Sequence, residues 1–159
     1  MKYDIIDNAL NQNDFEKLKN IVYDTNFAWF YQNGVAVGED DTYYFTHTFY
    51  NDNSITSPFW SFIEPVLNIL KPKALIRIKA NLYPNVGKFI NHKQHRDNPF
   101  EHLGAIIYLN TNNGKTVLHD DTKIDSKSNR ILMFDSSKDH NSTNCTDEKV
   151  RLNINFNYF

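Results

Sequence analysis

Two short segments carry a histidine and an aspartate two residues apart, a spacing that can bind a metal ion. Residues 95–97 read His-Arg-Asp, and residues 119–121 read His-Asp-Asp. Two histidines and one carboxylate on one face of an octahedron are the ligand set of non-haem iron(II) sites, which leaves three positions open. The spacing alone is weak evidence, because a chain with six histidines and many aspartates contains such pairs by chance.

The distance to a third ligand favours the first pair. In a barrel the third ligand comes from a neighbouring strand much later in the chain, so several strands must lie between them. His140 follows His95 by 45 residues, which leaves room for about four or five strands. It follows His119 by only 21 residues, which is too few. We therefore predict His95, Asp97 and His140 as metal ligands, and we interpret His119 and Asp121 as surface turn residues.

Arg151 is positioned to bind the far end of a dicarboxylic co-substrate. It follows His140 by 11 residues, so one tight turn places it on the next strand, facing inward. Arginine offers a carboxylate a bidentate partner of fixed charge. The polar face of this last strand carries Arg151 and three asparagines. Two interpretations stay open, a solvated face or a polar barrel interior that binds an anion.

The other histidines are more simply structural. Residues 92–94 read His-Lys-Gln and lack a carboxylate. His92 lies three residues before His95, so on a strand it would face the opposite side. We interpret His92 as a rim or structural residue, with a substrate contact as the alternative. His47 and His102 are isolated and are also interpreted as structural.

The composition is that of an ordinary globular chain. Its 159 residues suit a single domain, which we assign to residues 1–159. The net charge of −2 argues against a general binder of nucleic acid or of anionic membranes. Cys145 is the only cysteine, so neither a disulfide framework nor a thiolate zinc site is expected. The sequence shows no signal peptide and no apolar run of about 18 residues, so we expect a cytoplasmic protein without membrane association.

Two helices are expected in the first half of the chain. Asp14 is predicted to cap a helix that ends near Tyr23. A second helix is predicted to begin at Ser57-Pro58 and to end near Pro72. These helices would pack against the strands that follow.

An aromatic stretch, residues 27–50, lies between the two predicted helices and is predicted to be hairpin and loop. Its rings are the best candidates for a substrate lid, although packing of the helices onto a barrel is the simpler interpretation of any single ring. The candidate rings are Trp29, Phe30, Tyr31, Tyr43, Tyr44 and Phe45. We thus expect residues 1–72 to form helical backing and an aromatic loop, and residues 73–159 to form the barrel core.

The apolar pattern changes to a period of two after residue 72. Apolar and polar residues alternate along residues 74–83 and again along residues 149–159, which is typical of strands. Further short strands are predicted at the start of residues 3–10 and at residues 103–110, 115–118, 122–125 and 130–135. The fold class is therefore mainly β with backing helices (α+β), as a sandwich or barrel.

The segments around the candidate site resemble the prolyl-hydroxylase branch of the 2-oxoglutarate- and iron(II)-dependent oxygenases. They carry Tyr-Pro before the first His-x-Asp, a strand that ends in Tyr-Leu-Asn, a Gly-x-Thr turn, an Asn-Arg strand before the distal histidine and a final arginine strand. The resemblance covers roughly residues 74–159, and small bacteriophage-encoded members look most similar. It implies a double-stranded β-helix, a jelly-roll or cupin-like barrel, that uses iron(II), 2-oxoglutarate and O2.

The resemblance also implies a role for each site residue. His95, Asp97 and His140 would bind iron(II). Arg151 would bind the distal carboxylate of 2-oxoglutarate. Further co-substrate contacts are implied for Tyr83, Asn81, Asn153 and Tyr108. The cofactor carries the chemistry in this family, so no general base is assigned.

The implied reaction is hydroxylation of an unactivated C–H bond of a peptidyl or amino-acid-like substrate, such as a prolyl group, with succinate and CO2 as co-products. One alternative is a nucleic-acid demethylase of the same superfamily, suggested by Asn81-x-Tyr83 and Asn153. The acidic pI of about 6.3 and the lack of a long basic lid speak against it. Another alternative is a non-catalytic barrel that binds a metal or a carboxylate.

Overall fold

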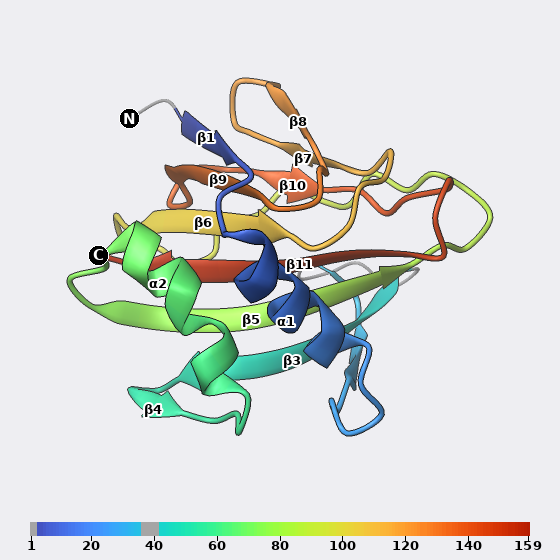
Figure 1. The fold of residues 1–159 in the computed structure, drawn as a ribbon. Coiled ribbons are helices and arrows are strands. Elements are labelled where there is room, and N and C mark those ends of the chain that lie inside the picture. Colours follow the sequence, from blue (N-terminus) through green and yellow to red (C-terminus); the bar gives the residue numbers. More distant parts are fainter. Residues whose placement is uncertain (1–2, 36–41) are drawn as a thin grey trace.

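The structure is a computed structural model that describes residues 3–35 and 42–159. Within these ranges the chain forms eleven strands, two α-helices and one 3-10 helix (Figure 1). In order, they are β1 (Tyr3–Asp7), α1 (Gln12–Val22), β2 (Phe30–Asn33), β3 (Tyr43–Asn51), β4 (Ser54–Ile55), η1 (Trp60–Phe62), α2 (Glu64–Leu70), β5 (Leu75–Pro84), β6 (Leu103–Tyr108), β7 (Lys115–Val117), β8 (Lys123–Asp125), β9 (Arg130–Asp135), β10 (Asn141–Ser142) and β11 (Val150–Tyr158).

Two antiparallel sheets enclose the interior of the barrel. The major sheet has the order β1-β9-β6-β11-β5-β3-β2, with β4 beside β3, and the minor sheet has the order β10-β7-β8. Isolated bridges between Asn91 and Thr143 and between His95 and His140 extend the minor sheet. Helices α1 and α2 cross one face of the major sheet (Figure 1). The predicted class, mainly β with backing helices, is confirmed.

The central strands β5 and β11 pair in register along almost their whole length, which sets the two faces of the major sheet. Their apolar side chains pack into the main core with the helices, for example Ile78 and Ile154, which are both 0% exposed. Their alternate side chains face the space between the two sheets. On that interior face lie Arg77, Lys79, Asn81 and Tyr83 of β5 and Arg151, Asn153, Asn155 and Asn157 of β11.

The asparagine-rich face of β11 is therefore the polar barrel interior and not a solvated face. Asn153 is 3% exposed and Asn157 is fully buried. Of the two interpretations of this strand, the polar interior is correct, whereas binding of an anion there stays a prediction. The buried polar groups of such an interior need hydrogen bonds, either to other side chains or to a bound molecule.

The predicted cap of the first helix is wrong by three residues. The N-cap of α1 is Asn11, whose side-chain oxygen accepts a hydrogen bond from the backbone N–H of Asp14 at 3.0 Å. Asp14 lies in the first turn, where a carboxylate is favourable at the positive end of the helix dipole. Both residue types are good N-caps, so composition alone does not choose between them.

The second predicted helix is interrupted. Residues Trp60–Phe62 form a single 3-10 turn, and the α-helix covers only Glu64–Leu70, with Pro65 in its first turn. Proline lacks the N–H needed inside a helix but suits its first position, so the α-helix restarts there. The predicted start at Ser57 is therefore wrong. No helix in the described ranges is long and apolar enough to cross a membrane.

The aromatic stretch is more strand than loop. β2 and β3 pair as a hairpin, and β3 joins the major sheet beside β5. Residues 36–41, between these two strands, lie outside the described residues. With β1 paired to β9, the first 72 residues supply sheet strands as well as the helical backing that was expected.

The rings of this stretch divide into packed and exposed groups. Tyr44 is 7% exposed, and Trp29 packs against the main core. Phe30, Tyr31 and Tyr43 are exposed, at 60%, 59% and 42%. The packing interpretation therefore holds for the first two rings, whereas the lid hypothesis stays open for the exposed ones.

Candidate metal centre

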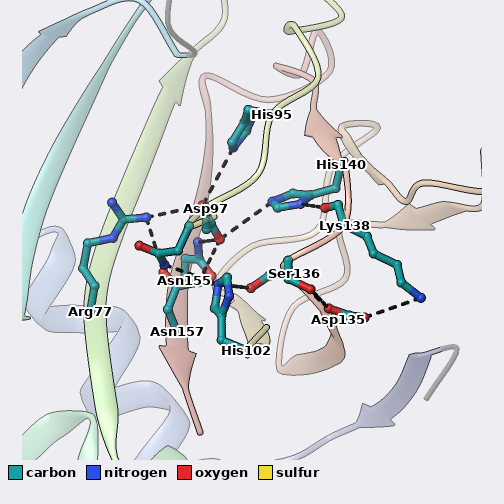
Figure 2. Close-up of polar contacts among 12 residues, drawn as sticks. Arg77, His95, Asp97, His102, Asp135, Ser136, Lys138, His140, Asn155 and Asn157 are labelled. Carbon is teal, nitrogen blue, oxygen red and sulfur yellow. Dashed lines mark hydrogen bonds and ion pairs between the residues drawn. The ribbon is translucent and has the colours of Figure 1, made fainter. Parts of the chain in front are cut away.

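His95, Asp97 and His140 converge at one place in the barrel interior (Figure 2). One potential ligand atom from each residue lies within 4.8 Å of the others. Nε2 of His95 is 3.9 Å from Oδ1 of Asp97, and Nε2 of His140 is 3.8 Å from Oδ2. The backbones of His95 and His140 exchange two N–H···O bonds of 2.9 and 3.0 Å, which hold the two imidazoles side by side.

Both imidazoles direct Nε2 toward this point. Nδ1 of His140 donates to the carbonyl of Lys138 at 2.9 Å, and Nδ1 of His95 donates to the carbonyl of Lys93 at 3.3 Å. A carbonyl can only accept, so Nδ1 of each ring carries a proton, and in the neutral form of the ring the lone pair is on Nε2. Burial lowers the pKa of His140, against the raising effects of Asp97 and the Lys138 carbonyl, so that ring is neutral at pH 7.

The carboxylate of Asp97 is oriented by amide and guanidinium donors from the two central strands (Figure 2). Asn157 Nδ2 donates to Oδ2 at 2.8 Å and Asn155 Nδ2 at 3.3 Å, while Arg77 Nη2 donates to Oδ1 at 3.3 Å. Burial alone would raise the pKa of Asp97, but His140, Asn157 and the other neighbours together lower it. The group is therefore an anion, as a metal ligand must be.

Arg151 is 1% exposed and has no acidic partner among the described residues. Its Nε donates to Ser126 Oγ at 2.8 Å and its Nη2 to Thr116 Oγ1 at 3.1 Å. The guanidinium carbon lies 5.3 and 5.7 Å from the ring centroids of Tyr83 and Tyr108. Nη1 is buried and makes no hydrogen bond to any residue that the structure describes. A buried guanidinium with a free donor fits an anionic ligand, because a buried charge is costly without a counterion.

A cavity joins the histidine pair to Arg151. Apart from Ile106 and Tyr83, its lining is made of polar side chains from both sheets. The lining residues are Asn81, Tyr83, His95, Ile106, Thr116, His140, Asn141, Ser142, Arg151, Asn153 and Asn155. A metal ion at one end and a carboxylate partner at the other would suit a short chelating dicarboxylate.

The other predicted co-substrate residues lie at or beside this cavity. Asn81 Nδ2 donates to Asn153 Oδ1 at 3.0 Å, and Oδ1 of Asn81 is buried without a partner. Tyr108 is absent from the cavity lining, but its hydroxyl donates to Thr116 Oγ1 at 2.8 Å beside Arg151. Tyr108 is thus placed to orient the hydroxyl of Thr116, which accepts a hydrogen bond from Arg151.

Several residues of the site were not predicted. Arg77, Asn155 and Asn157 contact Asp97, and the period-two pattern of their strands already places them on the polar face. Thr116 and Ser126 hold Arg151. Thr116 belongs to the Gly-x-Thr turn, whereas no sequence signal marks Ser126.

The remaining histidines have structural contacts. His92 stacks on Tyr83 at 5.3 Å between ring centroids, and its Nδ1 bonds to a serine hydroxyl at 2.9 Å. His47 bonds to the Ala28 carbonyl, and His102 bonds to Ser136 Oγ at 2.8 Å. Residues 119–121 form an exposed turn, as predicted.

Comparisons by sequence find no match among protein-family models or curated proteins. Comparison of structures finds several similar folds. A 2OG-Fe(II) oxygenase family protein from Burkholderia pseudomallei superimposes with a TM-score of 0.76 at 12% identity, covering 98% of this chain and 84% of that one. A prolyl hydroxylase from Trichoplax adhaerens, in complex with a hypoxia inducible factor peptide fragment, gives 0.69 at 16% identity, covering 99% and 83%.

The viral collagen prolyl hydroxylase of Paramecium bursaria Chlorella virus-1, in its 2OG complex, gives a TM-score of 0.67 at 12% identity. The superposition covers 99% of this chain and 95% of that one. At such low identities the likeness concerns the fold. The chain therefore has the double-stranded β-helix fold found in 2-oxoglutarate- and iron(II)-dependent oxygenases, as its sequence predicted.

Proposed function

We propose that this chain is a 2-oxoglutarate- and iron(II)-dependent dioxygenase that hydroxylates an unactivated C–H bond. One observation carries the proposal. Two imidazole Nε2 atoms and one carboxylate converge at one end of a cavity, and Arg151 lies at the other end with Nη1 unpartnered. The likeness to solved oxygenases supports the same assignment.

The donor set fits iron(II). Two neutral imidazoles and one carboxylate are the facial ligand set of non-haem iron(II) oxygenases. His95 and His140 have Nε2 free because Nδ1 of each is bonded to a carbonyl. The three donors to Asp97 orient its carboxylate and keep it ionised, so that its oxygen atoms are held in position to bind the metal ion.

The far end of the cavity fits the distal carboxylate of 2-oxoglutarate. Arg151 would bind it through the unpartnered Nη1, and Thr116 fixes the guanidinium at Nη2. Asn81 offers a buried carbonyl oxygen without a partner. We propose Tyr83, Asn153 and Tyr108 as further residues that shape this pocket.

Bound iron(II), with 2-oxoglutarate and O2, supplies the oxidant for C–H hydroxylation and yields succinate and CO2 as co-products. The chain itself binds, orients and excludes water. Side chains of Asp97 and His140 are 5% and 7% exposed, which keeps that part of the site dry. The side chain of His95 is 31% exposed, so the substrate would approach from its side.

We propose a peptidyl or amino-acid-like substrate, such as a prolyl group. The similar structures include prolyl hydroxylases, one of them in complex with a peptide fragment, and this supports the class. One of these prolyl hydroxylases comes from a virus. This supports the further proposal that the present chain is of the small bacteriophage-encoded type.

Binding and turnover test the proposal together. We expect the protein to bind Mn(II) and 2-oxoglutarate and, with Fe(II), to form succinate slowly without a primary substrate. His140→Ala should weaken Mn(II) binding by at least about 100-fold. Arg151→Met should weaken 2-oxoglutarate binding by a similar factor while Mn(II) binding is retained. His119→Ala, at an exposed turn, is the matched control. A wild-type protein that binds neither Mn(II) nor 2-oxoglutarate would refute the proposal.

A nucleic-acid demethylase is the second candidate. Asn81, Tyr83 and Asn153 all line the cavity, as the Asn-x-Tyr resemblance implies for that branch. The net charge of −2 argues against it, because phosphate backbones are bound by clustered cations. Succinate formation stimulated by methylated oligonucleotides, and by no peptide or amino acid, would select this candidate.

A further inference from the structure

The interior face of β5 carries two cations beside the metal centre. Arg77 contacts Asp97, as described above. Lys79 comes two residues later on the same face, and its ammonium donates to the hydroxyl of Tyr44 at 3.1 Å. Within residues 3–35 and 42–159, no carboxylate lies within 4.0 Å of the Lys79 ammonium.

Lys79 is therefore a half-buried cation whose one hydrogen-bond partner in the described part of the chain is neutral. Burial, and to a lesser extent Arg77, lower the pKa of Lys79 to about 8, against the raising effect of Asp97. At pH 7 the ammonium form still predominates. A desolvated charge without a counterion is unfavourable, and an anion bound beside it would relieve that cost.

The charges of the interior show that Asp97 does not neutralise Lys79. Among the described residues, Asp97 is the carboxylate that raises the pKa of Lys79, and it is already bonded to Arg77 and oriented toward the two histidines. A divalent metal ion at the triad would add positive charge. After 2-oxoglutarate occupies Arg151 and the metal, the surroundings of Lys79 would still favour an anion.

Lys79 is also separate from the Arg151 end of the cavity. It pairs with Asn155 across the β5–β11 ladder, and Asn155 contacts Asp97. Arg151 lies four residues away along β11, or about 13 Å at the usual rise of a strand. A co-substrate carboxylate bound by Arg151 would therefore lie too far from Lys79 to serve as its counterion.

Lys79 contacts the strand next to the edge strand of the major sheet, since Tyr44 lies on β3 and β2 follows it. Tyr44 stacks at 5.4 Å on Tyr83, which lines the cavity. Strand β2 follows as the edge of the sheet, and its Phe30 is 60% exposed. A substrate that enters from this edge would meet Tyr44 and Lys79 before the triad.

We propose that Lys79 and Tyr44 bind a carboxylate of the primary substrate. This inference rests on the proposed function. The ammonium and the phenolic O–H would both donate to one carboxylate, because Tyr44 now accepts from Lys79 and its own proton is free to donate. The substrate class is thus narrowed to molecules with an anionic group near the oxidised carbon, either a free amino acid or a peptide with an acidic residue.

Acetate is the minimal probe of this carboxylate site. The melting temperature of the protein is measured in sodium acetate and in sodium chloride at equal ionic strength, both with Mn(II) and 2-oxoglutarate and without them. We expect acetate to raise the melting temperature of the wild type by about 3 °C over chloride. Lys79→Met should abolish this difference, and Lys17→Met, which removes an exposed lysine of α1, should keep it.

The sign of the stability change separates binding from a structural role. Without acetate, Lys79→Met should melt at or above the wild-type temperature, because it removes an uncompensated charge and keeps the apolar stem. Lys79→Arg should retain the acetate effect, and Tyr44→Phe should reduce it. No acetate effect in the wild type, or an effect that survives in Lys79→Met, overturns the proposal.

Matched pairs then identify the source of the carboxylate. One pair is N-acetyl-L-proline and its amide, and the other is a short proline peptide with glutamate or with glutamine. The acid of at least one pair should bind about tenfold more tightly than its neutral partner, and equal binding within both pairs overturns the proposal. Binding of Mn(II) and of 2-oxoglutarate is measured separately. If neither binds, the oxygenase function is refuted. The carboxylate site is still tested in that case, because acetate is also added to the protein without Mn(II) and 2-oxoglutarate.

Discussion

The side-chain amide of Asn157 donates to Oδ2 of Asp97 at 2.8 Å, from the fully buried interior of β11. The same Nδ2 is 3.3 Å from Ser136 Oγ, and the Asn157 carbonyl accepts from Arg77 at 3.3 Å. Asn157 therefore connects the carboxylate to the groups that surround it. Such outer contacts fix the direction of a ligand and its basicity.

We predict that Asn157→Leu weakens Mn(II) binding by about 10- to 100-fold, because Asp97 loses its shortest hydrogen bond while its position in the chain is kept. Mn(II) titrations followed by electron paramagnetic resonance measure the affinity. Asn153→Leu is the matched control, since it removes an amide from the same face of β11 without a contact to Asp97. Equal losses in the two variants would mean that Asn157 has no specific part in orienting Asp97.

Gly114 gives the second prediction, because no side chain fits between it and Arg151. A Cβ atom at Gly114 would lie 2.5 Å from Arg151 Cδ and 2.8 Å from the backbone oxygen of Asn144. We predict that Gly114→Ala lowers the free energy of unfolding by about 1–3 kcal/mol, the usual cost of overpacking. The displaced guanidinium should also weaken 2-oxoglutarate binding by about tenfold or more.

Urea denaturation measures the first effect, and 2-oxoglutarate titration of the Mn(II)-loaded protein measures the second. Mn(II) affinity serves as the internal control, since the triad lies at the other end of the cavity. An unchanged 2-oxoglutarate affinity would show that Arg151 does not hold the co-substrate.

The central part of the site could be predicted because it is encoded by regular strands. The period of two on β5 and β11 is enough to place Arg77 and Asn157 on the same face of the sheet. The number of residues between His95 and His140 is set by the strands that must fit between them. Both signals are local or depend only on chain length, so they are visible in the sequence.

The surroundings of Arg151 could not be predicted in the same way. Thr116 and Ser126 belong to or follow short strands of the minor sheet, where three residues show no clear period. Their contact with Arg151 depends on how the two sheets close on each other. Gly114 likewise could not be interpreted from the sequence, because the close approach of Arg151 and of the Asn144 backbone to it appears only in the folded chain.

The helix boundary supplies a third prediction, since Asn11 and not Asp14 is the cap of α1. We expect Asn11→Ala to lower the free energy of unfolding by about 1 kcal/mol, because the N–H of Asp14 loses its acceptor. Asp14→Ala should cost less, about 0.5 kcal/mol, because it removes an exposed hydrogen bond from Asn11 Nδ2 and the favourable charge at the helix dipole. Chemical denaturation of both variants compares them, and a larger effect at Asp14 would restore the boundary expected from sequence.

The fourth prediction concerns pH and the clamp between β1 and β9. Asp7 accepts from Arg130 Nε at 2.7 Å and Nη2 at 3.0 Å, and from Lys127 Nζ at 3.0 Å. Hydrogen bonds from Arg130 and Lys127 hold the pKa of Asp7 well below its usual value. A carboxyl whose pKa is lower in the folded state stabilises the fold above its unfolded pKa of about 3.9, and loses this effect as the pH falls.

Asp7→Asn should therefore be less stable than the wild type at pH 7, by about 1 kcal/mol at most, because the pair lies at the surface. The difference should stay constant from pH 7 to about pH 5 and shrink below about pH 4, as Asp7 is protonated. Urea denaturation of both proteins at each pH gives the difference directly, which removes the contribution of all other acidic groups. Asp24→Asn, at an exposed turn away from β1, controls for loss of charge. A difference that grows as the pH falls would contradict the role given to Arg130, since protonation can only weaken an ion pair.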